Sequence, residues 1–328
     1  MKALITGCSG FVGSHLAEYL LANTDWDITA MIRWRSPLDN MQSFLNSPRV
    51  SYVYADLLDT LSIQNAVKTS KPDYIYHLAA QSYPQVSFTN PLVTLDTNAS
   101  GTLRVLDALK LYSPEAKICI CSSSEIFGRV SKDKLPIKED CEFGPASPYA
   151  ISKVSTDLIG RFYAEAYGMH VQVTRLFTHT GPRRGDVFHE SSFAKQIAMA
   201  EYGQIEPVIK VGNLKSLRTY ADVRDAVRAY HMLLTVNPVP GAYYNIGGMH
   251  TCTVGETLEY LLSLSPMKFT IEEDPNRLRP IDADLQVPDC TKFKAHTGWE
   301  PQIPFEQTML DLLNFWRDRV KTGQFLTR

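Results

Sequence analysis

The start of the chain constrains the fold most strongly. A short apolar run, Lys2–Thr6, leads directly into Gly7-Cys8-Ser9-Gly10-Phe11-Val12-Gly13, and an apolar-periodic run, Phe11–Asn23, follows. Glycine is needed where a chain turns tightly, approaches a pyrophosphate and lets a helix pack on a strand, and the helix N-terminus then offers N–H groups to the phosphates. The segment therefore predicts a strand, a phosphate-binding turn and a helix that together bind a dinucleotide through Gly7, Gly10, Phe11, Val12 and Gly13.

Beyond this segment, the first half of the chain alternates short β-rich runs with longer amphipathic runs. This alternation is typical of a parallel sheet with crossover helices. We therefore predict an α/β fold, a doubly wound parallel sheet of the Rossmann type. Its expected strands are Lys2–Thr6, Asp27–Ile32, Val50–Val53, Tyr74–Leu78, Lys117–Ser122 and His170–Leu176, and its expected helices are Phe11–Asn23, Leu61–Thr69, Pro91–Tyr112 and Pro148–Tyr167.

The alternation weakens after Leu176. There we expect helices near Ser192–Tyr202 and Ala221–Leu234, and strands near Val208–Val211 and Ala242–Ile246. A chain of 328 residues also exceeds what one compact core usually holds. The sequence thus predicts a cofactor-binding domain of residues 1–176 plus about 214–248, and a second, smaller α/β lobe of about 177–213 plus 249–328 that binds the substrate.

Composition excludes several other classes of protein. The apolar fraction of 44% and the charged fraction of 21% are ordinary for globular proteins, and a net charge of -2 provides no field for nonspecific binding of nucleic acid. No run approaches the roughly 18 apolar residues of a membrane span. The expected strand begins at the N-terminus, which leaves no room for an export signal, so we expect a cytoplasmic protein. The six scattered cysteines are expected to be free thiols, and no metal site is expected.

The end of the second expected strand indicates the cofactor. An NAD site normally places an acidic residue there to accept from the ribose hydroxyl, whereas this chain has Arg33, Arg35 and Ser36. Two guanidiniums and a hydroxyl suit a 2′-phosphate, so NADP is favoured over NAD. The alternative is that these arginines form solvated ion pairs on a loop. Further expected cofactor contacts are Asp56, Leu57, Leu78, Ala79 and Ala80.

A possible catalytic centre follows from the run Ser147-Pro148-Tyr149-Ala150-Ile151-Ser152-Lys153. Ser147 is a plausible N-cap and Pro148 suits the first helical turn, so Tyr149 and Lys153 lie one turn apart on one face. A phenol with a reference pKa near 10 is a poor base, but a neighbouring ammonium and an oxidised nicotinamide favour the phenolate. Ser123, after the fifth strand, is placed to hydrogen-bond the oxygen that Tyr149 deprotonates. The alternative is a surface tyrosine beside a solvated lysine.

The sequence resembles the extended short-chain dehydrogenases/reductases, close to the GDP-mannose 4,6-dehydratases and the GDP-4-keto-6-deoxymannose reductases. The similarity extends from Thr6–Gly13 to Gly298-Trp299-Glu300-Pro301. Leu78-Ala79-Ala80-Gln81-Ser82-Tyr83 and Arg184-Gly185 match the dehydratases, whereas Phe193-Ala194-Lys195-Gln196-Ile197 matches the reductases. The chain departs from both at Thr178, where an asparagine is usual, and at Thr219-Tyr220, where an aspartate and an aromatic residue are usual.

The resemblance implies a 4,6-dehydratase that acts on a GDP-linked hexose. Tyr149 and Lys153 would oxidise C4, Ser123 would hold O4, and Glu125 would remove the C5 proton, made acidic by the 4-ketone, and help expel the 6-hydroxyl as water. Glu125 has an alternative explanation as a turn-capping or ion-paired residue. The substrate-binding residues that the resemblance implies are Gln81, Ser82, Thr178, His179, Arg184, Lys195, Val211, Asn213, Arg218, Arg279 and Asp282.

Three other functions remain open. A reductase of 4-keto sugars would consume free NADPH, and a nucleotide-sugar 4-epimerase would use the same tyrosine and lysine. A binding module that senses NADP(H) is disfavoured because Tyr149 and Lys153 are both present. The resemblance also implies a homodimer or homotetramer that pairs the helices near Pro91–Tyr112 and Pro148–Tyr167.

Overall fold

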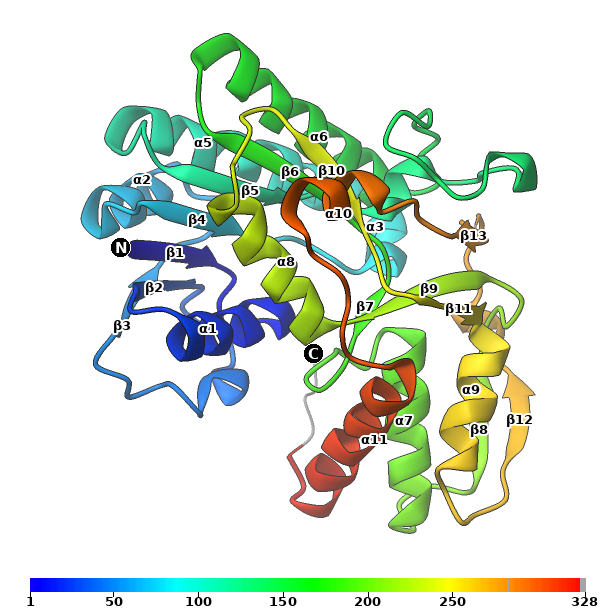
Figure 1. Cartoon of the computed structure of the whole chain (residues 1–328). Helices are drawn as coiled ribbons and strands as arrows, with labels where there is room; N and C mark the ends of the chain where they lie inside the picture. Colours follow the sequence, from blue (N-terminus) through cyan, green and yellow to red (C-terminus); the bar gives the residue numbers. More distant parts are fainter. Residues whose placement is uncertain (282, 325–328) are drawn as a thin grey trace.

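The computed structural model describes residues 1–281 and 283–324. Its centre is a parallel seven-stranded sheet in the order β10-β6-β5-β4-β1-β2-β3 (Figure 1). This order reverses between β1 and β4, so the prediction of a doubly wound sheet is confirmed. The strands are β1 (Lys2–Thr6), β2 (Asp27–Ile32), β3 (Val50–Tyr54), β4 (Tyr74–His77), β5 (Lys117–Cys121), β6 (Val171–Leu176) and β10 (Tyr243–Ile246).

Helices cover both faces of this sheet (Figure 1). On one face lie α1 (Phe11–Asn23), α8 (Val223–Thr235) and the short α10 (Thr291–Thr297), which bury Leu16, Leu233 and Phe293 in one apolar cluster. On the other lie α2 (Thr60–Ser70), α5 (Gly101–Tyr112) and α6 (Pro148–Tyr167), which bury Val67 and Leu109 in a second cluster. The inner strands β1, β4, β5 and β6 are therefore largely buried on both sides, as in a parallel sheet covered by helices.

The boundaries of α6 follow from local signals in its sequence. The Ser147 hydroxyl accepts a hydrogen bond from the Ala150 N–H at 3.0 Å, and Pro148 occupies the first turn. Gly168 ends the helix with φ of 66°, a left-handed conformation that favours glycine. The predicted range Pro148–Tyr167 is confirmed, and it places Tyr149 and Lys153 in the first two turns of the helix.

Two predicted helices differ from the structure. Pro91–Tyr112 is divided into α4 (Pro91–Leu95), a π-helical turn (Asp96–Ser100) and α5. The helix predicted from Ala221 begins at Val223, because β9 (Leu217–Asp222) continues through Asp222. The Asp222 carboxylate caps α8 by accepting a hydrogen bond from the Arg224 N–H at 2.8 Å, which is why the helix begins where it does.

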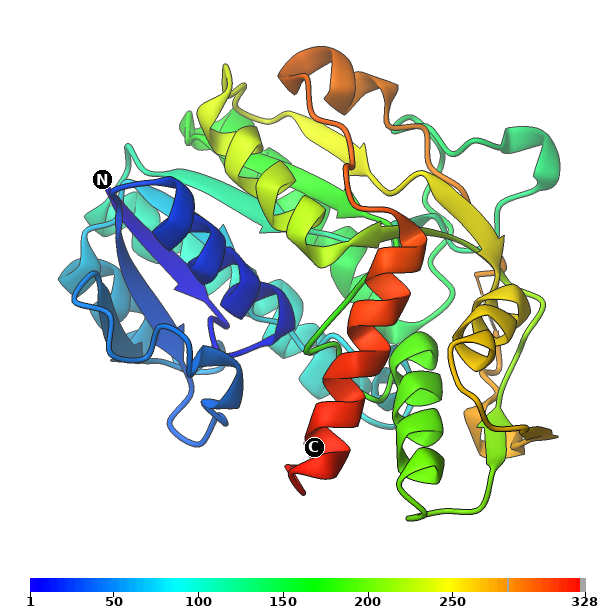
Figure 2. The same cartoon turned by 60° about the horizontal axis from the view of Figure 1, so that its bottom comes forward.

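A second packed unit lies beyond the carboxyl ends of the main strands (Figures 1 and 2). Its helices α7 (His189–Glu201), α9 (Val254–Ser263) and α11 (Phe305–Lys321) enclose Phe193, Leu258 and Trp316. Two small sheets complete it, one with β7 (His179–Thr180), β9, β11 (His250–Thr253) and β13 (Leu285–Gln286), the other with β8 (Val208–Val211) and β12 (Thr270–Glu273). The remaining short elements are α3 (Pro84–Thr89), η1 (Asp39–Met41), η3 (Ser124–Phe127), η4 (Lys132–Lys134) and η5 (Pro275–Arg277).

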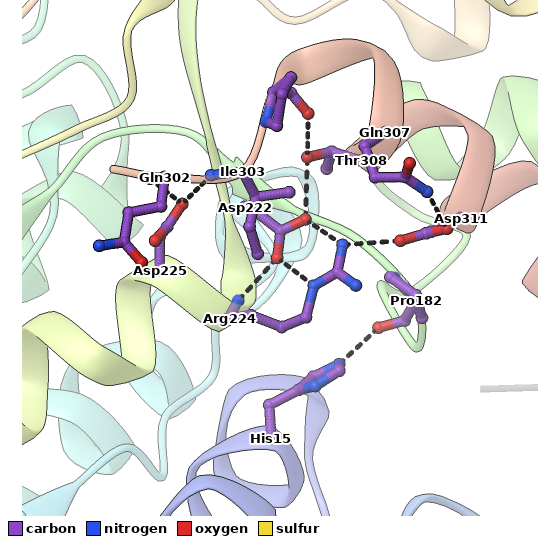
Figure 3. A network of polar contacts seen from close by, with 11 residues as sticks. His15, Pro182, Asp222, Arg224, Asp225, Gln302, Ile303, Gln307, Thr308 and Asp311 are labelled. Atoms are coloured by element: carbon purple, nitrogen blue, oxygen red, sulfur yellow. Dashed lines mark hydrogen bonds and ion pairs between the residues drawn. The ribbon is translucent and has the colours of Figure 1, made fainter. Parts of the chain in front are cut away.

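A polar network joins α11 to the start of α8 (Figure 3). The Asp222 carboxylate accepts hydrogen bonds from the Arg224 guanidinium and from the Thr308 hydroxyl of α11 at 2.8 Å. Arg224 also donates to Asp311 at 2.7 Å. Because Asp222 is fully desolvated and multiply bonded, this network fixes α11 relative to the main sheet.

Within residues 1–281 and 283–324, no helix combines the length and apolar character needed to cross a bilayer. The same residues contain no group of three or more histidine, cysteine or acidic side chains arranged to hold a metal ion.

Candidate active site

The turn after β1 can be built only with glycine. Gly7 has φ of +70°, and a Cβ added there would lie 3.0 Å from the Cα of Ala79. A Cβ at Gly13 would lie 2.4 Å from the carbonyl oxygen of Gly7. Gly10 is the N-cap of α1 and has no side chain to occupy the first turn. The predicted glycines therefore form a cradle of backbone at a helix N-terminus, which suits a pyrophosphate.

Polar residues that the sequence analysis missed hold this cradle together. The Thr6 hydroxyl accepts from the N–H groups of Leu78 and Ala79, both at 3.0 Å, and lies 3.0 Å from Nδ1 of His77. These bonds keep the predicted cofactor segment Leu78, Ala79 and Ala80 beside Gly7. Burial lowers the pKa of His77 to about 3, so its ring is neutral and serves as a fixed hydrogen-bonding link.

The predicted 2′-phosphate contacts lie at the end of β2. Arg33 and Arg35 are exposed, and the Ser36 N–H donates to the Arg33 carbonyl at 3.0 Å to close a turn between them. Asp56 follows β3 and accepts from the Leu58 N–H at 3.0 Å, while Leu57 is buried. These residues follow the ends of neighbouring strands, so they border one side of the glycine cradle.

Tyr149, Lys153 and Ser123 come together where β5 ends and α6 begins. Lys153 Nζ lies 6.0 Å from the centroid of the Tyr149 ring and donates to the Cys121 carbonyl at 2.7 Å. Ser123 is the N-cap of η3, and its side chain also forms a hydrogen bond with Tyr149. All three side chains are buried. The predicted trio is thus an assembled cluster rather than a solvated surface pair.

Burial shifts the pKa values of Tyr149 and Lys153 in opposite directions. It raises the pKa of Tyr149 to about 12, against the effect of its hydrogen bond with Ser123. It lowers the pKa of Lys153 to about 8. In each case the low-dielectric surroundings disfavour the charged form. Tyr149 is therefore protonated at neutral pH in the unliganded protein, and strong shifts of this kind are common in active sites.

Glu125 lies beside the trio but is paired with an arginine. Its carboxylate is 3.7 Å from Nη1 of Arg279, with exposed side-chain fractions of 19% and 26%. Its negative charge contributes to the raised pKa of Tyr149, so the two groups are within electrostatic range. The alternative explanation of Glu125 as an ion-paired residue is therefore present in the structure. Arg279 is a predicted substrate-binding residue, so this ion pair joins it to the predicted C5 base.

Three predicted substrate arginines lie within electrostatic range of His189. Burial, followed by the positive charges of Arg218, Arg184 and Arg279, lowers the pKa of His189 to about 4, although nearby Glu190 opposes the shift. Arg184 lies before α7, Arg218 in β9 and Arg279 after η5, so separate segments supply the three guanidiniums. Such a cluster suits a diphosphate.

Several other predicted substrate residues make contacts within the protein. Lys195 donates to Asp186 at 2.6 Å, and Asn213 donates to Ser216 at 2.8 Å. The Gln81 side chain donates to the Tyr83 carbonyl at 3.1 Å, which points it towards its own segment.

The remaining predicted substrate residues differ in exposure. Val211 is buried in the core of the second unit, whereas Ser82 is exposed. His179 stacks on Phe11 at 5.8 Å, and the Thr178 carbonyl accepts from the Ala221 N–H at 2.9 Å. Asp282 lies outside the described residues.

The structure adds two residues that the sequence analysis did not single out. Asn98 lies in the π-helical turn, where its amide donates to the Gln81 carbonyl and to the Ser152 hydroxyl, both at 2.9 Å. Arg277 donates to Ser192 at 2.9 Å and so links the segment after β12 to α7. The sequence signal for the turn at Asn98 was the run of polar residues around it within the predicted helix Pro91–Tyr112.

Comparison with known proteins places this geometry in a family. The family model described as GDP-mannose 4,6 dehydratase matches residues 4–312. The chain belongs to this family. The predicted membership is therefore confirmed.

Individual relatives include both branches named by the resemblance. GDP-mannose 4,6 dehydratase 2 of Arabidopsis thaliana is 33% identical over 324 residues, covering 93% of this chain and 84% of its own. GDP-6-deoxy-D-mannose reductase of Pseudomonas aeruginosa is 30% identical over 321 residues and covers 98% of both chains. The solved structure of RMD from P. aeruginosa complexed with NADPH has a TM-score of 0.84 and 31% identity, covering 97% of this chain and 99% of that one.

Proposed function

We propose that this protein is an NADP-dependent 4,6-dehydratase that converts a GDP-hexose such as GDP-mannose to its 4-keto-6-deoxy form. The observation that carries the proposal is the position of Glu125. Alcohol oxidation needs Ser123, Tyr149 and Lys153, whereas elimination of water also needs a base for C5. A carboxylate next to this trio, in a member of the dehydratase family, supplies that base.

The residues of the cradle fit a dinucleotide. A Cβ at Gly7 or Gly13 would clash with the backbone of Ala79 or Gly7, so these glycines allow the tight turn that presents the N-terminus of α1 to a pyrophosphate. Arg33 and Arg35 provide positive charge where a 2′-phosphate would lie. The remaining cofactor contacts are Phe11, Val12, Ser36, Asp56, Leu57, Leu78, Ala79 and Ala80. In this enzyme, NADP supplies the acceptor for the hydride that leaves C4 and the donor for the hydride that reaches C6.

Tyr149 acts on the C4 hydroxyl. Its phenolate removes the hydroxyl proton, Ser123 holds O4 by a hydrogen bond, and the ammonium of Lys153 stabilises the phenolate. Because burial raises the pKa of Tyr149 to about 12, the phenolate depends on positive charge near the ring when ligands are bound. Lys153, already buried against the Cys121 carbonyl, is positioned to provide part of that charge.

Glu125 acts after C4 is a ketone. It removes the acidified C5 proton and delivers a proton to the 6-hydroxyl, which leaves as water. Arg184, Arg218 and Arg279 hold the diphosphate and thereby fix the sugar relative to Glu125. The second unit, with Asn213 and Lys195, binds the nucleotide half, and the main sheet with its covering helices binds the cofactor.

A reductase of 4-keto sugars is the second candidate. It is favoured by the P. aeruginosa reductase, which is 30% identical over 98% of both chains. The two functions differ in their use of cofactor, since a reductase consumes NADPH and a dehydratase regenerates its NADP in each turnover. Incubation with GDP-mannose, catalytic NADP and no reductant, followed by mass spectrometry, distinguishes them. Loss of one water from the sugar nucleotide supports the dehydratase, and an unchanged sugar nucleotide rejects it.

We also propose that the enzyme is a cytoplasmic homodimer or homotetramer. Its six cysteines are free thiols, as in proteins of reducing compartments. Exposed apolar side chains gather on α5 and α6, where Leu111 is 60%, Ile151 46% and Phe162 54% exposed. Pairing of these helices between copies would cover this surface.

A further inference from the structure

Two neighbouring arginines before α7 bind different partners. Arg183 has φ of 72°, a left-handed conformation that is unusual for a residue with a side chain. It donates to Glu18 at 2.6 Å and to Ser14 at 3.2 Å, both on α1. Arg184 instead lies over the Phe188 ring at 3.4 Å and donates to Glu190 at 3.3 Å. The Arg183 guanidinium therefore binds α1, whereas the Arg184 guanidinium binds the start of α7.

The same helix makes two further contacts with this loop. His15 Nε2 donates to the Pro182 carbonyl at 2.9 Å, as Figure 3 shows. The Phe11 ring lies 5.3 Å from the Arg184 guanidinium. Phe11, Ser14, His15 and Glu18 are spaced three and four residues apart, so they form one face of α1. One face of the helix that begins in the phosphate cradle thus supports the loop that carries Arg184.

Glu18 is itself held from a second side. The Ser43 hydroxyl donates to the same carboxylate oxygen that accepts from Arg183. Although burial opposes it, these hydrogen bonds lower the pKa of Glu18, so the carboxylate stays ionised. Only 30% of the Glu18 side chain and 20% of the Arg183 side chain is exposed. The ion pair is therefore partly shielded and geometrically fixed.

From this arrangement we infer that Glu18 and Arg183 are positioning residues for Arg184. Their ion pair fixes the loop in its left-handed conformation, and this conformation aims Arg184 at the diphosphate of the nucleotide sugar. The inference rests on the proposed function in taking GDP as the ligand of Arg184. Loss of the pair weakens the hold on the diphosphate and leaves the chemical groups Tyr149, Lys153 and Glu125 in place.

The test compares Glu18→Gln with a matched control, Glu201→Gln. Glu201 forms an ion pair with Arg317 at 2.7 Å, similarly buried but on α7 and α11, away from this loop. Glu18→Gln is expected to raise the dissociation constant of GDP and the KM for GDP-mannose about tenfold, the order expected for one charge-assisted contact. The kcat and the dissociation constant of NADP stay within about twofold. Glu201→Gln changes none of these. An unchanged GDP affinity in Glu18→Gln overturns the inference.

A double-mutant cycle tests whether Glu18 acts through Arg184. In an Arg184→Ala background, Glu18→Gln should have little further effect on GDP binding, since the residue that it positions is gone. A full additional loss of affinity contradicts the inference. Arg183→Lys, which keeps the charge but loses the forked contact to Ser14 and Glu18, should reproduce Glu18→Gln and serves as the second variant if the first fails to fold. A parent protein that binds no GDP rejects the proposed function itself, which is a separate outcome.

Discussion

The Glu125 carboxylate faces the Arg279 guanidinium at 3.7 Å, so the group assigned to C5 is paired with a group assigned to the diphosphate. With the roles proposed above, the diphosphate of an entering nucleotide sugar would compete with Glu125 for the same arginine. The proposal therefore connects substrate binding to release of the elimination base through one ion pair.

Replacement of Glu125 should separate oxidation from elimination. In Glu125→Gln, Tyr149 and Lys153 remain, so hydride still leaves C4, but the C5 proton stays in place. Reduced cofactor is therefore expected to accumulate on the enzyme when GDP-mannose is added, as a rise in reduced-nicotinamide absorbance. The parent enzyme, which returns its hydride in each cycle, should show little change. A variant that eliminates water at the parent's rate removes Glu125 from the mechanism.

Tyr149→Phe should abolish most of the activity without affecting the fold. Loss of a general base lowers turnover by about a hundredfold or more, whereas the ring still fills its buried position. Tyr163→Phe is the matched control, because it removes another tyrosine hydroxyl of α6, bonded to Asp107 at 2.8 Å, away from the site. Turnover and the thermal midpoint are measured for both. Equal turnover in the two variants refutes the assignment.

The cofactor preference should depend on Arg33 and Arg35. Each charge-assisted contact to a phosphate contributes on the order of 1.5–3 kcal/mol, so NADP should bind about tenfold or more tightly than NAD. Arg33→Gln with Arg35→Gln should remove most of this difference. Lys132→Gln, at another exposed cation, should leave it unchanged. Fluorescence titration with both dinucleotides measures the ratio, and equal affinities in the parent would reject NADP.

Stability should fall in mild acid because of buried neutral histidines. Burial lowers the pKa of His77 and His179 to about 3, and that of His15 and His189 to about 4. The unfolded chain binds these protons near pH 6.5, so between about pH 6.5 and 4 the unfolded state holds more protons than the folded one. The free energy of unfolding then decreases as the pH falls, by up to about 1.4 kcal/mol per pH unit for each histidine.

Urea unfolding at pH 7, 6 and 5 measures this slope. His189→Gln should reduce it, because an amide can keep the contact that Nε2 of His189 makes with the Tyr220 hydroxyl at 2.7 Å without binding a proton. A slope that is the same in parent and variant shows that His189 does not contribute.

The sequence predicted those parts of the fold that depend on local patterns. The glycines after β1, the capping residues of α6 and the apolar strands all act within a few residues, so the main sheet and the positions of Tyr149 and Lys153 followed from them. The helix start at Val223 did not, because Ala221 and Asp222 pair with β7 in a small sheet that depends on distant segments. The residues Ala221 and Asp222 carry no signal of their own for this pairing.

The residues of the candidate site were predicted in part, but the contacts between them were not. Arg184, Arg218 and Arg279 were named from resemblance, but their approach to His189 depends on how the second unit packs on the first. Asn98 was missed because a π-helical turn follows from contacts with Gln81 and Ser152, which lie far away in the sequence. Likewise, the contact of Glu125 with Arg279 joins residues from the two halves of the chain, which local patterns do not reveal.

Transfer of a label within one substrate molecule tests the central claim most directly. GDP-mannose carrying deuterium at C4 is incubated with the enzyme and catalytic NADP, and the position of the label in the product is read by NMR. A 4,6-dehydratase is predicted to move the deuterium from C4 to C6 of the 4-keto-6-deoxy sugar without net consumption of cofactor. Deuterium that stays at C4, together with oxidation of added NADPH by a 4-keto sugar nucleotide, would contradict the dehydratase function and establish the reductase in its place.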